Sequence, residues 1–315
     1  MTGEQTAAEH DAARETVRET ATREYADHRE LLFSLVYNLL GSVADTEDVL
    51  QDTWLAWAAR RADAAAGPVE HPKAYLVRVA VNRALAQQAA VSRRRETYVG
   101  PWLPEPLVGP LAEPAAGGDG PAQVERAESV SLALLVVLET LSPLERSAFV
   151  LHEVFGYSGA EIAGILGRSP AAVRQLTKRA REHVRARRPR YEPEPAVRRQ
   201  VTERFLAAAL GGDLAALLEL LSPDVTLWGD GGGKAPGGLR PLTGRSKVAR
   251  LLAGLAPKTG RGLDVEWRSV NGAPAVVLSA FGRAFAVLVL DLVPDGDRIS
   301  GIYAVSNPDK LGGLA

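Results

Sequence analysis

Two short helices joined by a tight turn are predicted by the stretch Ser158-Gly-Ala-Glu-Ile-Ala-Gly-Ile-Leu-Gly-Arg-Ser-Pro-Ala-Ala-Val-Arg-Gln-Leu-Thr-Lys-Arg-Ala-Arg181. Ser158 and Glu161 have the spacing of a capping box, which satisfies the free backbone N–H groups of a helix start. Gly167 ends the first helix, because glycine readily adopts the left-handed conformation of a C-terminal cap. Ser169 caps the second helix, and Pro170 suits its first turn. This is the layout of a helix-turn-helix, whose second helix enters the major groove of DNA.

The second helix has one apolar and one basic face. At 3.6 residues per turn, the apolar side chains that share a face are Val173, Leu176, Ala180 and Val184. The opposite face carries Arg174, Gln175, Lys178, Arg179 and Arg181. Arginine and glutamine can pair with base edges, and basic side chains can neutralise phosphates. An ordinary solvated helix is the alternative, but caps, turn and charge together favour DNA binding.

Composition limits the class of protein. The chain has 315 residues and a formal net charge of −1, so two or three domains are expected and any basic surface is local. It has no cysteine, and its five histidines lack metal-ligand spacing, so we expect no cofactor and no metal site. We find no signal peptide and no apolar run of the ~20 residues that a membrane helix needs. These features predict a cytoplasmic protein.

Changes in sequence texture divide the chain. We expect an N-terminal arm over residues 1–23, a helical domain over 24–98, a linker rich in proline and glycine over 99–122, and a second helical domain over 123–190. Residues 196–315 predict an α+β domain, with helices over 197–210, 214–221 and 246–255. Its strands are predicted over 225–228, 265–270, 275–281, 284–293 and 299–305, in a curved antiparallel sheet.

Two helices of the first domain carry polar faces. In the helix at 45–57, Asp45, Asp48 and Asp52 lie opposite Leu50, Trp54 and Trp57. The acidic face is either solvated surface, which spacing alone favours, or a docking face for a basic partner. The helix from Pro72 presents Arg78, Asn82 and Arg83, which could face nucleic acid. Tyr75 is either a packing residue, the commoner role, or a stacking platform for an unpaired base.

These segments, in this order, resemble an extracytoplasmic-function (ECF) sigma factor of bacterial RNA polymerase. The helix at 45–57 and the helix at 73–83 look like the conserved and promoter-melting parts of sigma domain 2. The segment 141–157 and the helix-turn-helix look like sigma domain 4. The chain also resembles the sigma J-like group with a fused SnoaL-like domain, through Trp102-Leu-Pro-Glu-Pro106, Asp230-Gly-Gly-Gly-Lys234 and Asn307-Pro-Asp-Lys-Leu311. The fold class it implies is multidomain: two all-α sigma domains and an α+β cone.

The resemblance implies site residues and partners. Contacts to the −35 promoter element fall on Arg168, Ser169, Ala171, Arg174, Gln175, Lys178, Arg179 and Arg181, and contacts to the −10 element on Tyr75, Arg78, Asn82 and Arg83. Core polymerase would bind Asp45, Asp48, Gln51 and Asp52 through the clamp helices of its large subunit, with the flap as a further contact. Promoter DNA is the other partner, and no membrane and no obligatory separate anti-sigma factor are expected.

The C-terminal cone is either a regulatory module or an enzyme. It has neither histidine nor cysteine after Tyr191, which removes the commonest general base and the thiol nucleophile. The acids that remain are Asp224, Asp230, Asp264 and Asp291, and the loop 230–234 lacks P-loop spacing. A flexible loop that meets another surface is the better interpretation.

We therefore expect no enzyme but a regulator in cis. Its interdomain contacts would be Trp102, Leu103, Pro104, Glu105, Pro106, Asp230, Gly231, Gly232, Gly233, Lys234, Asn307, Pro308, Asp309, Lys310 and Leu311. The alternative for the whole protein is a helix-turn-helix regulator that works without polymerase.

Overall fold

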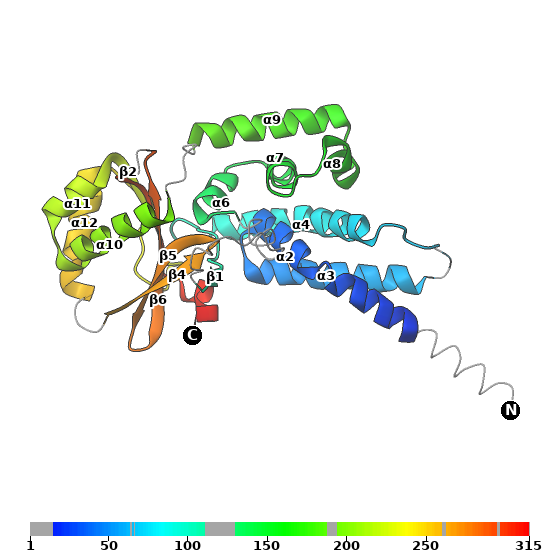
Figure 1. Ribbon diagram of the computed structural model, residues 1–315, viewed down its shortest axis with the longest axis horizontal. Coiled ribbons are helices and arrows are strands. Elements are labelled where there is room, and N and C mark those ends of the chain that lie inside the picture. Colours follow the sequence, from blue (N-terminus) through cyan, green and yellow to red (C-terminus); the bar gives the residue numbers. More distant parts are fainter. Residues whose placement is uncertain are drawn as a thin grey trace. The chain divides into compact units, whose positions relative to one another are not determined.

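The computed structural model describes residues 15–63, 65, 67–110, 130–187, 194–259, 263–294 and 297–314. The chain forms two compact units (Figure 1). The first contains residues 1–92 and 142–181, and the second contains residues 93–141 and 182–315. The expected arm over residues 1–23 is helical from residue 15 onward, in a helix that continues to residue 26. Residues 1–14 of the arm and residues 111–122 of the expected linker lie outside the described residues.

The N-terminal part of the first unit is a helical bundle. Residues 15–26 are followed by α2 (Arg29–Leu40), α3 (Val43–Ala62) and α4 (Pro72–Glu96). Trp57 is fully buried, and its indole Nε1–H donates to the Ala21 carbonyl oxygen at 3.1 Å. Tyr25 stacks at a tilt on Trp54 and donates to the Leu50 carbonyl at 2.8 Å. The apolar face expected for the segment 45–57 thus forms the bundle core.

The rest of the first unit holds the helix-turn-helix. It contains α7 (Pro143–Phe149), the π-helical turn η2 (Val150–Val154), α8 (Gly159–Leu166) and α9 (Pro170–Arg187). Ser142–Glu145 and Ser158–Glu161 form complete capping boxes at the starts of α7 and α8. Gly167 ends α8 with φ of 60°. The caps predicted from the sequence are confirmed.

The second unit is built on a seven-stranded sheet in the order β1-β4-β5-β6-β7-β2-β3. Its strands are β1 (Val108–Gly109), β2 (Leu221–Asp230), β3 (Leu242–Thr243), β4 (Leu263–Val270), β5 (Ala273–Ala280), β6 (Arg283–Leu292) and β7 (Ile299–Val305). The expectation of an antiparallel sheet was wrong at one place, because β2 and β7 pair in parallel. The other pairs are antiparallel.

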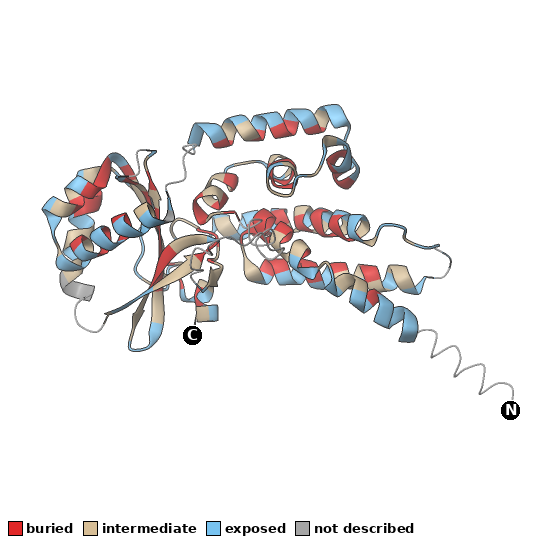
Figure 2. Cartoon of the chain, in the orientation of Figure 1, coloured by how far each residue is buried: buried red, intermediate tan, exposed pale blue. Residues whose placement is uncertain are grey.

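Both faces of this sheet are covered. On one face lie α10 (Pro195–Gly211), α11 (Leu214–Leu220) and α12 (Arg245–Thr259), around a core that includes Phe205, Leu217 and Ile302 (Figures 1 and 2). On the other face, Leu103 of the linker and Leu132 of α6 (Leu132–Leu138) pack against the strands. The first helix of the expected second helical domain therefore packs on the cone.

The linker also extends the sheet. Val108 and Gly109 pair with Val270 and Ser269 of β4 as the edge strand β1. The Leu107 N–H donates to Asn271 Oδ1, and the Asn271 N–H returns a bond to the Leu107 carbonyl. The chain therefore passes from the first helical domain directly into the fold of the cone. Within the described ranges, no helix is both long and apolar enough to cross a lipid bilayer.

Candidate functional site

The basic face of α9 is exposed, as its amphipathic pattern requires. Val173, Leu176 and Ala180 are buried, whereas Arg174, Gln175 and Lys178 are exposed, as are Arg168, Ser169 and Ala171 around the turn. The Ser169 hydroxyl caps α9 by accepting the Ala172 N–H at 3.2 Å. Arg174 and Gln175 sit where a recognition helix presents side chains to base edges.

Two other predicted −35 residues are held by carboxylates of the same unit. Arg179 pairs with Glu145 at 2.9 Å, and Arg181 pairs with Glu153 at 2.5 Å. Hydrogen bonds from Ser142 lower the pKa of the Glu145 carboxyl. These pairs orient the two guanidinium groups along the edge of the helix-turn-helix, which suits contacts to a phosphate backbone better than contacts to bases.

The predicted −10 residues lie on one side of α4. The Arg78 guanidinium lies 5.7 Å from the ring centroid of Tyr75, and Arg83 pairs with Asp52 at 2.9 Å. Asn82 donates its side-chain amide to the Arg78 carbonyl at 2.7 Å and to the Ile165 carbonyl of α8 at 3.0 Å. A cavity of about 600 Å³ opens here, and its lining includes Tyr75 and Arg78.

The acidic face of α3 is less uniform than its spacing predicts. Asp48, Gln51 and Asp52 are exposed, but Asp45 is only 6 % exposed and accepts a hydrogen bond from Gln87 Nε2 at 3.1 Å. Asp45 occupies the first turn of α3, where the helix dipole favours a carboxylate. Its position makes it a structural residue of the bundle, and only the other three lie on an open surface.

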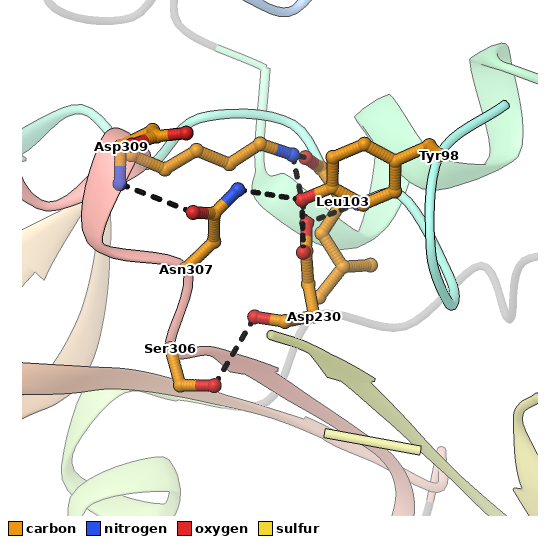
Figure 3. Close-up of polar contacts among 7 residues, drawn as sticks. Tyr98, Leu103, Asp230, Ser306, Asn307 and Asp309 are labelled. Atoms are coloured by element: carbon orange, nitrogen blue, oxygen red, sulfur yellow. Dashed lines mark hydrogen bonds and ion pairs between the residues drawn. The ribbon is translucent and has the colours of Figure 1, made fainter. Parts of the chain in front are cut away.

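The second unit contains a buried polar cluster around Asp230, which we call the Asp230 cluster: Tyr98, Leu103, Asp230, Asn307 and Lys310. Asp230 is 0 % exposed. Its carboxylate accepts from the Tyr98 hydroxyl at 2.5 Å and from the Leu103 N–H at 2.9 Å (Figure 3). It also accepts from the Lys310 ammonium at 2.7 Å. The Asn307 amide donates in turn to the Tyr98 hydroxyl at 2.7 Å. One carboxylate thus joins the linker to the C-terminal segment.

Charge and aromatic contacts complete this cluster. Lys310 also donates to the Leu103 carbonyl, and its ammonium lies 4.1 Å from the ring centroid of Trp102. Arg95 covers the same ring at 3.5 Å and pairs with Glu139 at the end of α6. Burial lowers the pKa of Lys310 to about 8, while the charge of Asp230 opposes that shift, so the Lys310 ammonium is still mostly charged at neutral pH. Burial and the Asp230 hydrogen bond raise the pKa of Tyr98.

The glycines after Asp230 allow the loop to approach the linker. Gly232 has φ of 59°, and a Cβ atom there would lie 2.4 Å from Asn307 Nδ2 and 2.9 Å from the Tyr98 hydroxyl. A Cβ on Gly233 would meet Val99, and one on Gly231 would meet the Ala235 carbonyl. The expected flexible loop is instead a tight turn packed on the linker, and only Lys234 reaches outward, to an exposed pair with Asp309 at 2.5 Å.

The structure therefore brings together the three motifs of the predicted regulatory set. Leu103, Pro104 and Pro106 are buried, and Leu311 packs in the core on the linker side of the sheet. Glu105, Pro308 and Asp309 are more open to solvent. Tyr98 and Arg95 were not among the predicted site residues. Their one signal in the sequence is a lone tyrosine between a basic helix end and the first linker prolines. Among the described residues, no group of acidic or histidine side chains is arranged to hold a metal ion.

Comparisons with known proteins show the family of the chain. Residues 25–95 match the family model of sigma-70 region 2, and residues 131–184 match that of sigma-70 region 4. The chain is 38 % identical to ECF RNA polymerase sigma factor SigJ of Mycobacterium tuberculosis, over 92 % of this chain and 93 % of that protein. It is 29 % identical to ECF RNA polymerase sigma factor SigG of that species, over 88 % and 78 % of the two chains.

A solved structure extends the similarity to the whole fold. The crystal structure of the M. tuberculosis extracytoplasmic function sigma factor SigJ matches with a TM-score of 0.72 and 36 % identity, over 93 % of this chain and 98 % of that one. The mixed sheet and its helices fit a SnoaL-like C-terminal domain. With both sigma-70 regions in place, the chain belongs to the extracytoplasmic-function sigma factors of RNA polymerase, close to SigJ.

Proposed function

We propose that this sigma factor, which binds core RNA polymerase and recognises promoters, is regulated in cis by its SnoaL-like domain. The observation that carries the proposal is the Asp230 cluster, in which a fully buried carboxylate of the cone binds linker residues Tyr98 and Leu103. The same linker supplies β1 to the sheet of the cone. Because the cone is tethered, this docking is effectively unimolecular and needs no separate anti-sigma protein.

The proposed promoter contacts follow the exposure of the side chains. Arg174 and Gln175 read bases of the −35 element, whereas Arg168, Lys178, Arg179 and Arg181 contact phosphates. Replacement of Arg174 by alanine should weaken −35 binding by about 1–3 kcal/mol and relax base preference at one position. Titration of duplexes with single base changes measures this. A loss spread equally over all sequences would instead identify Arg174 as a phosphate contact.

For polymerase docking we propose the exposed surface of α3. Asp48, Gln51 and Asp52 present acceptors to solvent there, and they suit a basic partner surface such as the clamp helices of the large subunit. The buried Asp45 supports this face from inside through Gln87. The contact with the flap belongs to the region 4 helices, as the family relation suggests.

The cone itself is proposed to be regulatory and not catalytic, in a cytoplasmic protein. Neither histidine nor cysteine follows Tyr191 in the sequence. Apolar side chains such as Phe205, Leu220 and Ile302 pack together between the helices α10–α12 and the sheet. A site for acid–base chemistry would need polar groups that converge in such a place. Turnover of a small molecule by the purified chain would contradict this part of the proposal.

Transcription with purified core polymerase tests the regulatory role. We compare the full chain with Asp230→Asn, which damages the cluster, and with the matched control Asp309→Asn, which removes only an exposed ion pair. The proposal expects promoter-specific transcription or core affinity to change for Asp230→Asn and to stay near the wild-type value for Asp309→Asn. Point variants are preferable to deletion of the cone, because deletion would expose Leu103 and Leu132. No change in either variant would refute regulation through this cluster.

The alternative of a regulator that works without polymerase is separated by a gel shift. A sigma factor should form a promoter complex that depends on core polymerase. A complex of equal affinity without the core enzyme would favour the alternative.

A further inference from the structure

The cone binds the backbone of the linker at two places. Leu103 donates its N–H to Asp230 at 2.9 Å, and its carbonyl accepts from Lys310. Leu107 donates its N–H to Asn271 Oδ1 at 3.2 Å, and its carbonyl accepts the Asn271 N–H at 2.9 Å. Asp230 and Asn271 are both buried, at 0 % and 3 % exposure. The cone thus bonds both the donor and the acceptor of each of these two linker residues.

The side chains around these two places suit an extended chain. Leu103 is fully buried in the core on this face of the sheet, and the ring of Trp102 lies 4.1 Å from the Lys310 ammonium. Pro104 and Pro106 are buried and have no N–H to satisfy. A proline also biases the residue before it toward extended backbone. The linker seat is the name we give to the groups that bind this chain: Asp230, Asn271, Lys310 and the core under Leu103.

The polar groups of the seat select the class of ligand. An apolar small molecule could fill the place of Leu103, but it would leave the buried groups of Asp230 and Asn271 without partners, which costs free energy. An extended peptide with the same pattern of residues satisfies them. The linker of a second copy offers the same contacts, but the chain's own linker is tethered and acts at an effective concentration of about millimolar. A displacing ligand must therefore bind more tightly than the linker does.

The outer edge of the sheet can supply the additional contacts. Within the part of the chain that the structure describes, β1 pairs with Val270 and Ser269, and no strand pairs with the remaining outer edge of β4, Leu263–Arg268. Pro110 follows β1 in the chain, and proline is a poor strand residue. A peptide with β-branched residues at this point can form more backbone hydrogen bonds along β4, by addition of a strand to the sheet.

We propose that the linker seat is a peptide-recognition site, in which the linker is an intramolecular ligand and an extended peptide of another protein is the displacing ligand. The pattern of that peptide is an aromatic residue, leucine, proline, any residue and proline, followed by a β-forming segment. Its binding releases the linker from the cone. The inference rests on the proposed regulation in cis and names the partner through which that regulation acts.

A labelled synthetic peptide tests the proposal on the full chain. The probe contains residues 97–109 followed by Val-Thr-Val-Thr, and the control probe carries Leu103→Asp. Fluorescence anisotropy compares probe binding to wild type, Leu103→Ala and the double variant Leu103→Ala/Asp230→Asn. Loss of a buried leucine weakens docking of the chain's own linker, so Leu103→Ala should bind the probe at least about 10-fold more tightly than wild type. The double variant, whose seat is damaged, should lose that gain.

Hydrogen exchange of the wild-type chain keeps the test independent of how the variants fold. An isotope-labelled probe in excess should speed exchange of the chain's own residues 98–109 at least about 10-fold and leave α10 unchanged. The proposal is overturned if the probe binds no better than its control, if the double variant binds as tightly as Leu103→Ala, or if exchange of residues 98–109 does not change.

Two further outcomes separate this inference from its neighbours. Sedimentation that shows a wild-type dimer with exchanged linkers would make the ligand a second copy and overturn the proposal. Probe binding is measured without polymerase, so its failure refutes peptide recognition alone. Unchanged transcription by Asp230→Asn would instead refute the proposed function.

Discussion

Replacement of Asp230 by asparagine is the sharpest perturbation of the linker site. The carboxylate accepts three hydrogen bonds at 2.5–2.9 Å, from the Tyr98 hydroxyl, the Leu103 N–H and the Lys310 ammonium. An amide keeps one oxygen acceptor, but its NH2 group would face a donor. It also leaves the Lys310 side chain, which is 10 % exposed, without its counter-charge. Loss of one partner of a buried ion pair costs about 3–5 kcal/mol. The remaining acceptor places the expected cost near the lower end, ~3 kcal/mol.

Hydrogen exchange measures this cost where it arises. A loss of ~3 kcal/mol raises the population of the undocked linker roughly 100-fold. Peptides that cover residues 98–109 should therefore exchange roughly 100-fold faster in Asp230→Asn, while peptides from α2 and α3 keep their wild-type rates. In the control Asp309→Asn, the lost pair with Lys234 is about 60 % exposed at both side chains, and such pairs contribute about 0–1 kcal/mol. Equal exchange of residues 98–109 in wild type and Asp230→Asn would refute the reasoning.

Two further predictions concern the same cluster. Gly232→Ala should destabilise the chain by about 1–3 kcal/mol, because the added Cβ would collide with Asn307 and Tyr98 and because φ is positive there. The control Gly254→Ala lies in a helix with open space around it and should be neutral or stabilising. Thermal unfolding of both variants measures the difference. Lys310 has a pKa of about 8 in the folded chain, against an ordinary 10.5. Between these two pH values the unfolded chain binds more protons than the folded chain. The free energy of unfolding therefore rises with pH there, by at most about 3 kcal/mol. From pH 7 to pH 10, the free energy of unfolding measured with denaturant should rise in wild type relative to Lys310→Met. A fall of that difference with pH would mean that the site raises the pKa of Lys310.

Local signals explain why the helix-turn-helix could be predicted. Ser158, Glu161 and Gly167 form their contacts within one or two helical turns, so their spacing in the sequence is already their geometry. The Asp230 cluster has no such signal. Tyr98 and Asp230 are 132 residues apart, and a glycine run before an expected helix gives no indication of what it packs against. The three motifs indicated that contacts exist, but Tyr98, which donates to Asp230 and accepts from Asn307, lies outside all three.

The boundaries of β2 show a different limit. The sequence predicted a strand only from Val225, because Ser222-Pro223-Asp224 has turn composition. In the structure β2 begins at Leu221 and pairs with β7 across a register shift between Leu221 and Thr226. The irregularity accommodates the proline, which cannot donate to a ladder. The parallel pairing of β2 with β7 follows from topology over some 70 residues, which no local pattern encodes.

The two-sided burial of β6 bears on how the linker can be released. Val287 and Val289 face the core that contains Leu103, and Leu288 and Leu290 face the core under the helices, which accounts for an almost continuous apolar strand. Removal of the linker would expose the first of these faces, and burial of apolar surface stabilises by about 25 cal/mol per Å². Loss of the Asp230 bonds alone therefore loosens the linker without freeing it. Full release would require that another apolar surface take the place of Leu103, so under the proposed regulation we expect a signal to act by exchange of partners on this face.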